Sequence, residues 1–215
     1  MRLIHRKQMW VLTAQGWLLT LLCFIALLLL MVTNIHPFLA PYSPIKAEVL
    51  VVEGWITDYA IEDAIKEFER GGYQKLITTG LPLERGYYLA QYKNFAELSA
   101  ATLITLGFDR EKLVAVPTPY AIRNRTNASA QALHQWLANS GLEIKGINLF
   151  SLDVHARRSW LIFKQVLAPD INVGVIAVKS QSYDPNHWWV SSEGVRSIIS
   201  EGIAYIYARL IDWKS

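Results

Sequence analysis

Residues 147–160, INLFSLDVHARRSW, predict a strand that leads directly into a helix. The apolar residues of the first half predict a short strand, Asp153 turns the chain, and a helix is expected from Val154 onward. Open α/β sheets bind ligands where a strand end meets a helix N-terminus, because the free backbone amides there attract anions. His155 and Arg158 would share one face of the helix, since residues three apart lie side by side. The stretch therefore predicts an anion or phosphoryl site, without naming the reaction.

The rest of the chain repeats this alternation of strand and helix. Short apolar runs predict further buried parallel strands, at residues 47–52, 75–79, 113–116 and 173–178. Capping residues and glycines delimit helices after the strands, at about residues 58–70, 94–106, 126–140, 154–167 and 192–213. Strict alternation favours the α/β class, as a Rossmann-like open, mostly parallel sheet of about five strands with helices on both faces. We expect this domain to occupy residues 47–215.

The composition suits one globular domain behind an apolar segment. The chain has 215 residues, of which 52% are hydrophobic, a formal net charge of +3 and one cysteine. About 170 residues follow the apolar segment, enough for one well-buried domain. Because no basic run occurs outside the N-terminus, nucleic acid is not expected as a partner. The single cysteine, Cys23, excludes an intramolecular disulfide.

The N-terminal apolar segment predicts one transmembrane helix, at residues 9–33. Residues 17–32 carry no charge, and the whole segment is close to the roughly twenty residues that a helix needs to cross a bilayer. Basic residues within 1–8 precede it, so the positive-inside rule places that end in the cytoplasm and the C-terminal domain on the periplasmic side. Residues 34–46, with three prolines, are expected to form a stiff linker. The lipid bilayer is therefore a predicted partner.

Two other interpretations of the apolar segment stay open. A cleaved signal peptide is the first, although the segment is long and residues 38–41 lack a small-x-small cleavage site. A buried helix of a soluble protein is the second, although such helices usually keep a polar face.

Candidate site residues lie in the loops and helix starts that follow the first two strands. Glu53 directly follows the first strand, where a carboxylate is either catalytic or a cap or ion-pair partner. Thr79 and Gly80 follow the second strand and would let the backbone approach an anion, although a plain turn also explains the glycine. Glu97 is a further catalytic candidate, but its spacing from Asn94 also fits a capping box.

A basic cluster lies between the third strand and its helix, in Arg123-Asn124-Arg125-Thr126-Asn127. Arginines at a helix N-terminus oppose the helix dipole, so a bound anion would resolve that conflict. Arg125, Thr126 and, one unit later, Arg158 are therefore candidate anion-binding residues. His155 beside Arg158 is a candidate acid or base, although a lone histidine is most often structural.

Several motifs of other α/β proteins are missing from the sequence. It contains no His-Glu-x-x-His, cysteine pair or Asp-rich loop, so no metal ligand is predicted. No Walker or dinucleotide glycine pattern and no G-x-S-x-G elbow occurs, and any cofactor stays unknown. The aromatic loop with Tyr183, Trp188 and Trp189 could wall a pocket or touch the membrane, although packing on the last helix explains it as well.

Four motifs, taken in order, resemble the YdcF/SanA/ElyC-like family of bacterial envelope proteins: Thr79-Gly80, Ala96-Glu97-Leu98, Arg125-Thr126-Asn127-Ala128 and His155-Ala156-Arg157-Arg158. The similarity covers roughly residues 47–209 and implies an α/β domain that often follows one N-terminal membrane helix. Family members usually carry a glycine pair after the first strand, where this chain has Glu53-Gly54-Trp55. The resemblance implies a role in envelope integrity, drug exclusion, or cell-wall precursor and lipid-carrier metabolism.

Two functions follow as expectations. The first is an enzyme, a hydrolase or transferase, that acts on a phosphorylated or anionic cell-envelope precursor, either small or lipid-linked. Arg125 and Arg158 would bind the anion, His155 would move a proton, and Glu53 or Glu97 would orient the histidine or a nucleophile. The second is a non-catalytic ligand-binding or regulatory module for envelope integrity.

Overall fold

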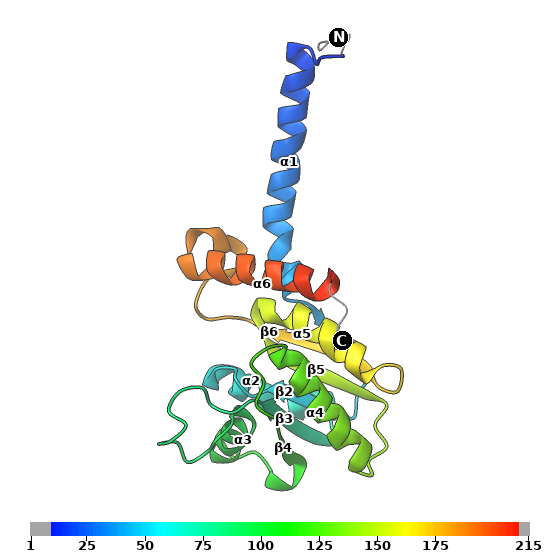
Figure 1. Ribbon diagram of the computed structural model, residues 1–215, viewed down its shortest axis with the longest axis vertical. Coiled ribbons are helices and arrows are strands. Elements are labelled where there is room, and N and C mark those ends of the chain that lie inside the picture. The colour runs from blue at the N-terminus through cyan, green and yellow to red at the C-terminus, as the bar shows by residue number, and fades with distance from the viewer. Residues whose placement is uncertain (1–9, 211–215) are drawn as a thin grey trace, which may run out of the picture. The chain divides into compact units, whose positions relative to one another are not determined.

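The computed structural model of the chain describes residues 10–210. It divides the chain into two compact units, residues 1–35 and 36–215, which are described separately below. The elements follow one another in the order shown in Figure 1.

Most of helix α1 (Ala14–Leu39) belongs to the first unit. Among residues 10–210, α1 is the one helix that is long and apolar enough to cross a membrane, a property that signal sequences share. An apolar helix was expected at residues 9–33, and the structure has it from Ala14 to Leu39, so it begins and ends later than expected. The basic residues within 1–8, which determine the predicted orientation, and Met9 lie outside the described residues, so that orientation stays a prediction.

The segment expected to be a proline-rich linker is helical in its first part, because α1 continues to Leu39. Pro37 lies inside the helix. A proline at this position removes the backbone hydrogen bond to Thr33 and its ring crowds that carbonyl, and the helix ends two residues later, at Leu39. His36 and Leu39 are the two buried residues of α1, and both belong to the second unit.

The second unit is built on a six-stranded sheet in the order β1-β6-β5-β2-β3-β4. The strands are β1 (Tyr42–Ser43), β2 (Val49–Glu53), β3 (Lys75–Gly80), β4 (Leu113–Pro117), β5 (Gly146–Leu152) and β6 (Asn172–Val178). Strands β2 to β6 pair in parallel at the expected positions, which confirms the α/β class.

The expectation of about five parallel strands was incomplete, because β1 adds a sixth strand that runs antiparallel to β6. Its two residues, Tyr42 and Ser43, lie between Pro41 and Pro44 in the expected linker. A strand of this length has no measurable alternation of polar and apolar residues, and prolines are tolerated beside an edge strand. Only the pairing with β6 defines it.

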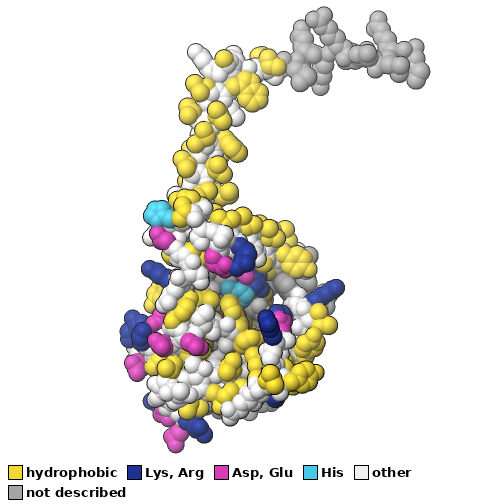
Figure 2. Space-filling view, turned by 90° about the vertical axis from the view of Figure 1, so that its left-hand side faces the viewer, with side chains coloured by type: hydrophobic (Ala, Val, Ile, Leu, Met, Phe, Trp, Pro, Cys, Tyr) yellow, Lys and Arg dark blue, Asp and Glu magenta, His cyan; other side chains and the backbone are white. Residues whose placement is uncertain are grey.

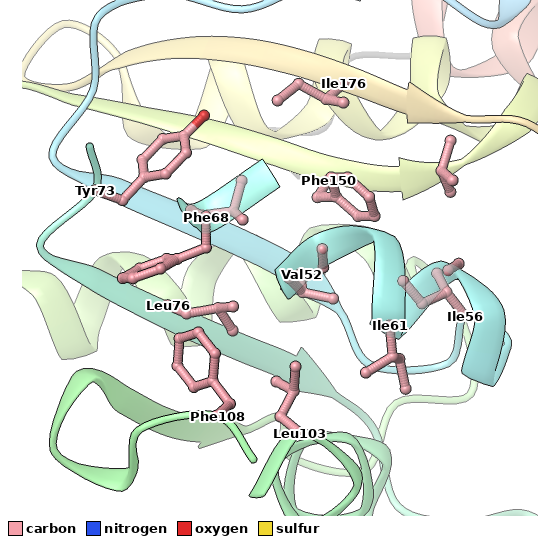
Figure 3. Close-up of a cluster of buried hydrophobic side chains, with 14 of the residues drawn as sticks. Val52, Ile56, Ile61, Phe68, Tyr73, Leu76, Leu103, Phe108, Phe150 and Ile176 are labelled. Atoms are coloured by element: carbon pink, nitrogen blue, oxygen red, sulfur yellow. The ribbon is translucent and has the colours of Figure 1, made fainter. Parts of the chain in front are cut away.

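Helices cover both faces of the sheet, as the alternation predicted. They are α2 (Asp58–Gly71), α3 (Phe95–Thr105), α4 (Arg125–Asn139), α5 (Ala156–Leu167) and α6 (Ser192–Leu210), with short 3₁₀ helices η1 (Arg110–Lys112), η2 (Asp153–His155) and η3 (Pro185–Val190). α2 and α3 pack on Leu50 and Val52 of β2 (Figure 3). α4 and α5 pack on Val49 and Val51 from the other side. A central parallel strand is buried on both faces in this way, so its residues are apolar without alternation.

The strand order creates a topological switch point between β2 and β5. From β2 the chain runs outward through β3 and β4, and it then crosses back to β5, on the other side of β2, before reaching β6. Open α/β sheets bind ligands in the crevice that forms outside the carboxyl ends of two such strands. Glu53 ends β2, and η2 with His155 follows β5, so both lie at this crevice.

Candidate functional site

A cleft of about 920 Å³ opens at the carboxyl edge of β2 and β5. Figure 2 shows a hollow on this unit around which histidine, carboxylate and basic side chains gather. Most of the sequence candidates line the cleft: Glu53, Thr79, Arg125, Thr126, His155 and Arg158. Two candidates, Gly80 and Glu97, are not among the residues that line it.

Glu53 is a buried carboxylate whose oxygens are both hydrogen-bonded. Its side chain projects from the last position of β2 and is 4% exposed. Ser151 of β5 donates to Oε2, and Ser159 of α5 donates to Oε1 over 3.0 Å. Burying a charge is tolerated only where such partners replace water, so the two serines hold the carboxylate in one orientation.

His155 lies between two carboxylates. Its Nδ1 is 2.9 Å from Oε1 of Glu201, and its Nε2 is 3.8 Å from Oε1 of Glu53. The ring of Trp55 meets the imidazole edge-on, with centroids 4.7 Å apart. Because a carboxylate can only accept, the contact with Glu201 assigns the proton to Nδ1. Nε2 is then the nitrogen that can take up a proton, on the side of Glu53.

Arg158 holds Glu201 through both of its oxygens. Nε donates to Oε2 over 2.9 Å and Nη2 donates to Oε1 over 3.1 Å. Nη1 donates to the hydroxyl of Thr126 over 3.3 Å. Nη2 also lies 3.0 Å from Nδ1 of His155, but it donates to Glu201 when Nδ1 carries a proton. Glu201 is thus the anionic side chain that pairs with Arg158 in this structure, while binding of a ligand anion by Arg158 stays a prediction.

The surroundings of Glu201 keep it ionised. Burial acts to raise its pKa, but the hydrogen bonds from His155 and Arg158, with their charges, outweigh burial and lower the pKa to about 2. An ionised Glu201 accepts a hydrogen bond from Nδ1 and thereby orients His155 with Nε2 toward Glu53.

Arg125 lines the cleft but does not join the cluster around Glu201. It pairs with Glu84 of the long loop after β3, with Nη1 2.8 Å from Oε1, and both side chains are largely exposed. Asn124, which precedes α4, has a φ of 54° and makes no side-chain cap. The first turn of α4 therefore presents backbone amides without a capping side chain next to Arg125, as an anion site requires.

Thr79 is the candidate site residue whose side-chain hydroxyl has no hydrogen-bond partner. Its Oγ1 is the one buried side-chain nitrogen or oxygen within residues 10–210 that has no hydrogen-bond partner. Such orphaned groups are rare, because each costs about 1–3 kcal/mol when left without a partner. Since Thr79 lines the cleft, a bound ligand could accept or donate the missing hydrogen bond.

Gly80 and Glu97 have local explanations in the structure. A Cβ on Gly80 would lie 2.6 Å from Cβ of Phe95, so the glycine lets β3 and α3 approach closely. Asn94 accepts a hydrogen bond from the backbone N–H of Glu97 over 2.8 Å and thereby caps α3. This agrees with the capping alternative for Glu97, although the reciprocal side-chain bond of a full capping box is not among the contacts described.

Asp153, interpreted from sequence only as a turn, is a buried member of the site. It has a φ of 47°, a region that residues with a Cβ seldom adopt. One oxygen is 2.8 Å from Nε2 of His36, and Tyr183 donates its hydroxyl to the other. Burial, followed by the hydrogen bond to Asp153, raises the pKa of the Tyr183 hydroxyl well above its usual range, so it stays protonated. Tyr183 also lines the cleft, which is one of the uses left open for the aromatic loop.

Sequence reasoning missed Glu201, Asp153 and the two serines that hold Glu53. A signal for Glu201 existed, because it is the one charged residue in a mostly apolar stretch, Ile198 to Ile206. Ser151 and Ser159 gave no such signal, since small hydroxyl residues are common in buried strands and helices. Across the part of the chain that the structure describes, no three His, Cys, Asp or Glu side chains form a group that could hold a metal ion.

Comparison with known proteins adds no family to this description. No family model matches the chain, and a search of curated proteins found no match. The resemblance to the YdcF/SanA/ElyC-like family therefore stays an inference from the four sequence motifs.

Proposed function

We propose that the protein is a membrane-anchored enzyme of the cell envelope, a hydrolase or transferase that acts on a phosphorylated or otherwise anionic precursor. One observation carries the proposal. His155 is fixed between Glu201 and Glu53 in the same cleft that presents Arg125 and the uncapped N-terminus of α4. The cleft thus combines a proton acceptor with groups that attract an anion.

The proton transfer follows from the geometry of His155. Glu201 holds the Nδ1 proton, so Nε2 accepts a proton from a water molecule or a substrate hydroxyl as it attacks the phosphorus atom. The same nitrogen then returns the proton to the oxygen that leaves. Glu53, 3.8 Å from Nε2, stabilises the imidazolium between these two steps. The attacking group is water or a second substrate rather than Ser151 or Ser159, because both serines are fully buried and bonded to Glu53.

The anion would be bound at the start of α4. Arg125 reaches this region with an exposed guanidinium, and the amides of the first turn of α4 lie beside it. The free hydroxyl of Thr79 is a further donor. Arg158 has a different role from the one expected from sequence: since Glu201 and Thr126 take up its donors, we assign it as a positioning residue.

The apolar helix α1 supports a substrate at the membrane. Anchoring confines the cleft to the region near the bilayer and raises the frequency of encounters with a lipid-linked phosphate. The resemblance to the YdcF/SanA/ElyC-like family, together with the basic residues before α1, supports a bacterial envelope location with the second unit on the periplasmic side.

A second candidate function is a non-catalytic ligand-binding or regulatory module. The ion pair between Arg125 and Glu84 favours it, because an arriving anion would replace Glu84 and release the long loop after β3. Such a module would change its loop on binding, without turnover.

One experiment on the full chain in lipid nanodiscs distinguishes the enzyme from the regulatory module. We would measure phosphate release from a polyprenyl diphosphate, and binding of inorganic phosphate by calorimetry, for the wild type, His155→Asn and the control His187→Asn. His187 is exposed and bonded to Asp184, outside the cleft. The enzyme proposal expects His155→Asn to lower turnover by about 10²- to 10⁴-fold while phosphate still binds. Binding without any wild-type turnover would favour the regulatory module, and absence of both would refute the anion site.

A further inference from the structure

Helix α6 carries an exposed apolar stripe from Ile199 to its end at Leu210. The stripe consists of Ile199, Ile203, Ile206 and Leu210, which are 53%, 65%, 58% and 78% exposed. Their spacing of four, three and four residues places them on one face of the helix. Trp189 and Val190, which are also exposed, come just before α6. Contiguous apolar surface of this kind marks a site that contacts another apolar body.

The stripe belongs to a helix that also forms part of the cleft. α6 packs against α5 (Figure 1) and contributes Ser197, Glu201 and Ala204 to the lining. Gly194, Ile198 and Ala208 are its buried residues. One side of α6 therefore lines the cleft and packs on the core, while the isoleucine and leucine side chains of the opposite side are exposed.

The second unit holds α6 beside the point at which the chain leaves α1. Phe38, in the last turn of α1, meets the ring of Tyr205 edge-on, with centroids 5.4 Å apart. Arg157 donates from Nε to the carbonyl of Phe38 over 2.6 Å, and its guanidinium lies 4.4 Å from the centroid of the Phe38 ring. All of these residues belong to the unit 36–215, so the contact is internal to it.

Chain length then restricts what can cover the stripe. Phe38 lies six positions after Val32, the last residue of the apolar stretch 17–32, so even a fully extended chain places it within about 20 Å of the end of that stretch. As a helix the same segment spans about 9 Å, close to the depth of the lipid headgroup region on one side of a bilayer. Any membrane that holds α1 therefore lies within reach of α6.

We propose that α6 lies on the lipid surface, with the stripe Ile199-Ile203-Ile206-Leu210 inserted at the boundary between headgroups and acyl chains. An interfacial helix presents an apolar face of this kind to lipid, and Trp189 and Arg209 suit the flanking positions, where indole rings and arginines meet headgroups. The proposal rests on the membrane-anchor part of the proposed function, not on the chemistry of His155. The proposal also specifies which class of substrate the cleft would take. A cleft that shares α6 with the lipid surface favours a substrate whose acyl or prenyl tail stays in the membrane while its anionic head enters the cleft.

The test measures the depth of single residues on the full chain in vesicles. Cys23, the one cysteine, is first replaced by Cys23→Ser. A cysteine is then introduced by Ile203→Cys and labelled with a small environment-sensitive fluorophore. The matched control is Leu106→Cys, at the end of α3, where an exposed leucine is replaced away from α6. Vesicles contain anionic and zwitterionic phospholipids, with or without spin labels high on the acyl chain.

The proposal expects the label at position 203 to shift to shorter wavelength and to be quenched several-fold by the spin-labelled lipid, while the label at position 106 is quenched only by aqueous iodide. A label at position 203 that behaves like the control, on protein that floats with the vesicles, overturns the proposal. A label protected from both quenchers overturns it in favour of a second protein chain. Protein that does not float with the vesicles refutes the anchor itself. Phosphate release in the same preparation reports separately on the catalytic proposal.

Discussion

The imidazole of His155 and the carboxylate of Glu201 meet at 2.9 Å, although 46 residues separate them in the chain. This contact joins η2, at the end of β5, to α6. It places the proton of His155 on Nδ1 and leaves Nε2 on the side of Glu53, while the same carboxylate of Glu201 also pairs with Arg158. Both consequences can be tested by changing single residues.

Replacing Glu201 should change how stability depends on pH. The pKa of Glu201 is lowered from 4.5 to about 2 in the folded state, so its stabilising effect is present above about pH 4.5 and is lost as the pH falls toward 2. The shift corresponds to about 3 kcal/mol. Denaturant unfolding of the full chain in detergent, from pH 6 to pH 2, should show a loss of this order for the wild type and a flatter profile for Glu201→Gln.

The control for this prediction is Glu193→Gln, on the same helix. Glu193 pairs with Arg196 at the surface, where ion pairs contribute little. Its pH profile should follow the wild type. If Glu201→Gln also follows the wild type, the carboxylate does not hold His155 and Arg158 in solution.

Removing the buried carboxylate of Glu53 should destabilise the second unit. Glu53→Ala leaves the hydroxyls of Ser151 and Ser159 without their acceptor, and each lost buried bond costs about 1–3 kcal/mol. We expect a combined loss of about 2–5 kcal/mol in the free energy of unfolding, together with loss of turnover. Glu69→Ala, at an exposed position of α2, should change stability by less than about 0.5 kcal/mol. Equal effects of the two substitutions would contradict the assignment.

Phosphate affinity should depend on Arg125 and on its partner Glu84 in opposite directions. Arg125→Ala removes a charged donor beside the start of α4 and should weaken phosphate binding by about tenfold. Glu84→Gln frees the guanidinium from its ion pair and should strengthen binding several-fold. Calorimetry at low and moderate salt measures both, with Arg123→Ala as the neighbouring control outside the cleft lining. A loss of affinity on Glu84→Gln would place the anion elsewhere.

Replacing Gly80 or Gly202 by alanine should change the free energy of unfolding in opposite directions. Gly80→Ala forces a Cβ to within 2.6 Å of Cβ of Phe95, so β3 and α3 must separate, at a cost of about 1–3 kcal/mol. Gly202→Ala, inside α6, meets nothing within 4 Å and should stabilise the helix by about 0.5–1 kcal/mol. Thermal unfolding of the two variants measures this difference. Destabilisation by both would show that the surroundings of Gly202 are more crowded than described.

The sequence by itself determined the alternation of strands and helices. Runs such as 49–52 and 173–178 lack polar residues because parallel strands are buried on both faces, and this requirement is visible locally. The placement of His155 and Arg158 on neighbouring positions after β5 was also accessible, since three residues in a helical turn bring side chains together. The crevice rule then brought Glu53 to the same edge without any knowledge of contacts.

Only the tertiary structure decided which charges meet. Glu201 reaches His155 because α6 packs against α5, and no periodicity reports on the partner of a helix that lies later in the chain. Arg125 and Arg158, equivalent by local pattern, have different partners, Glu84 and Glu201, because these carboxylates arrive from a loop and from a helix remote in sequence. The two-residue strand β1 likewise exists only through its pairing with β6. Local spacing specifies secondary structure, whereas long-range packing selects the partner of each charged group.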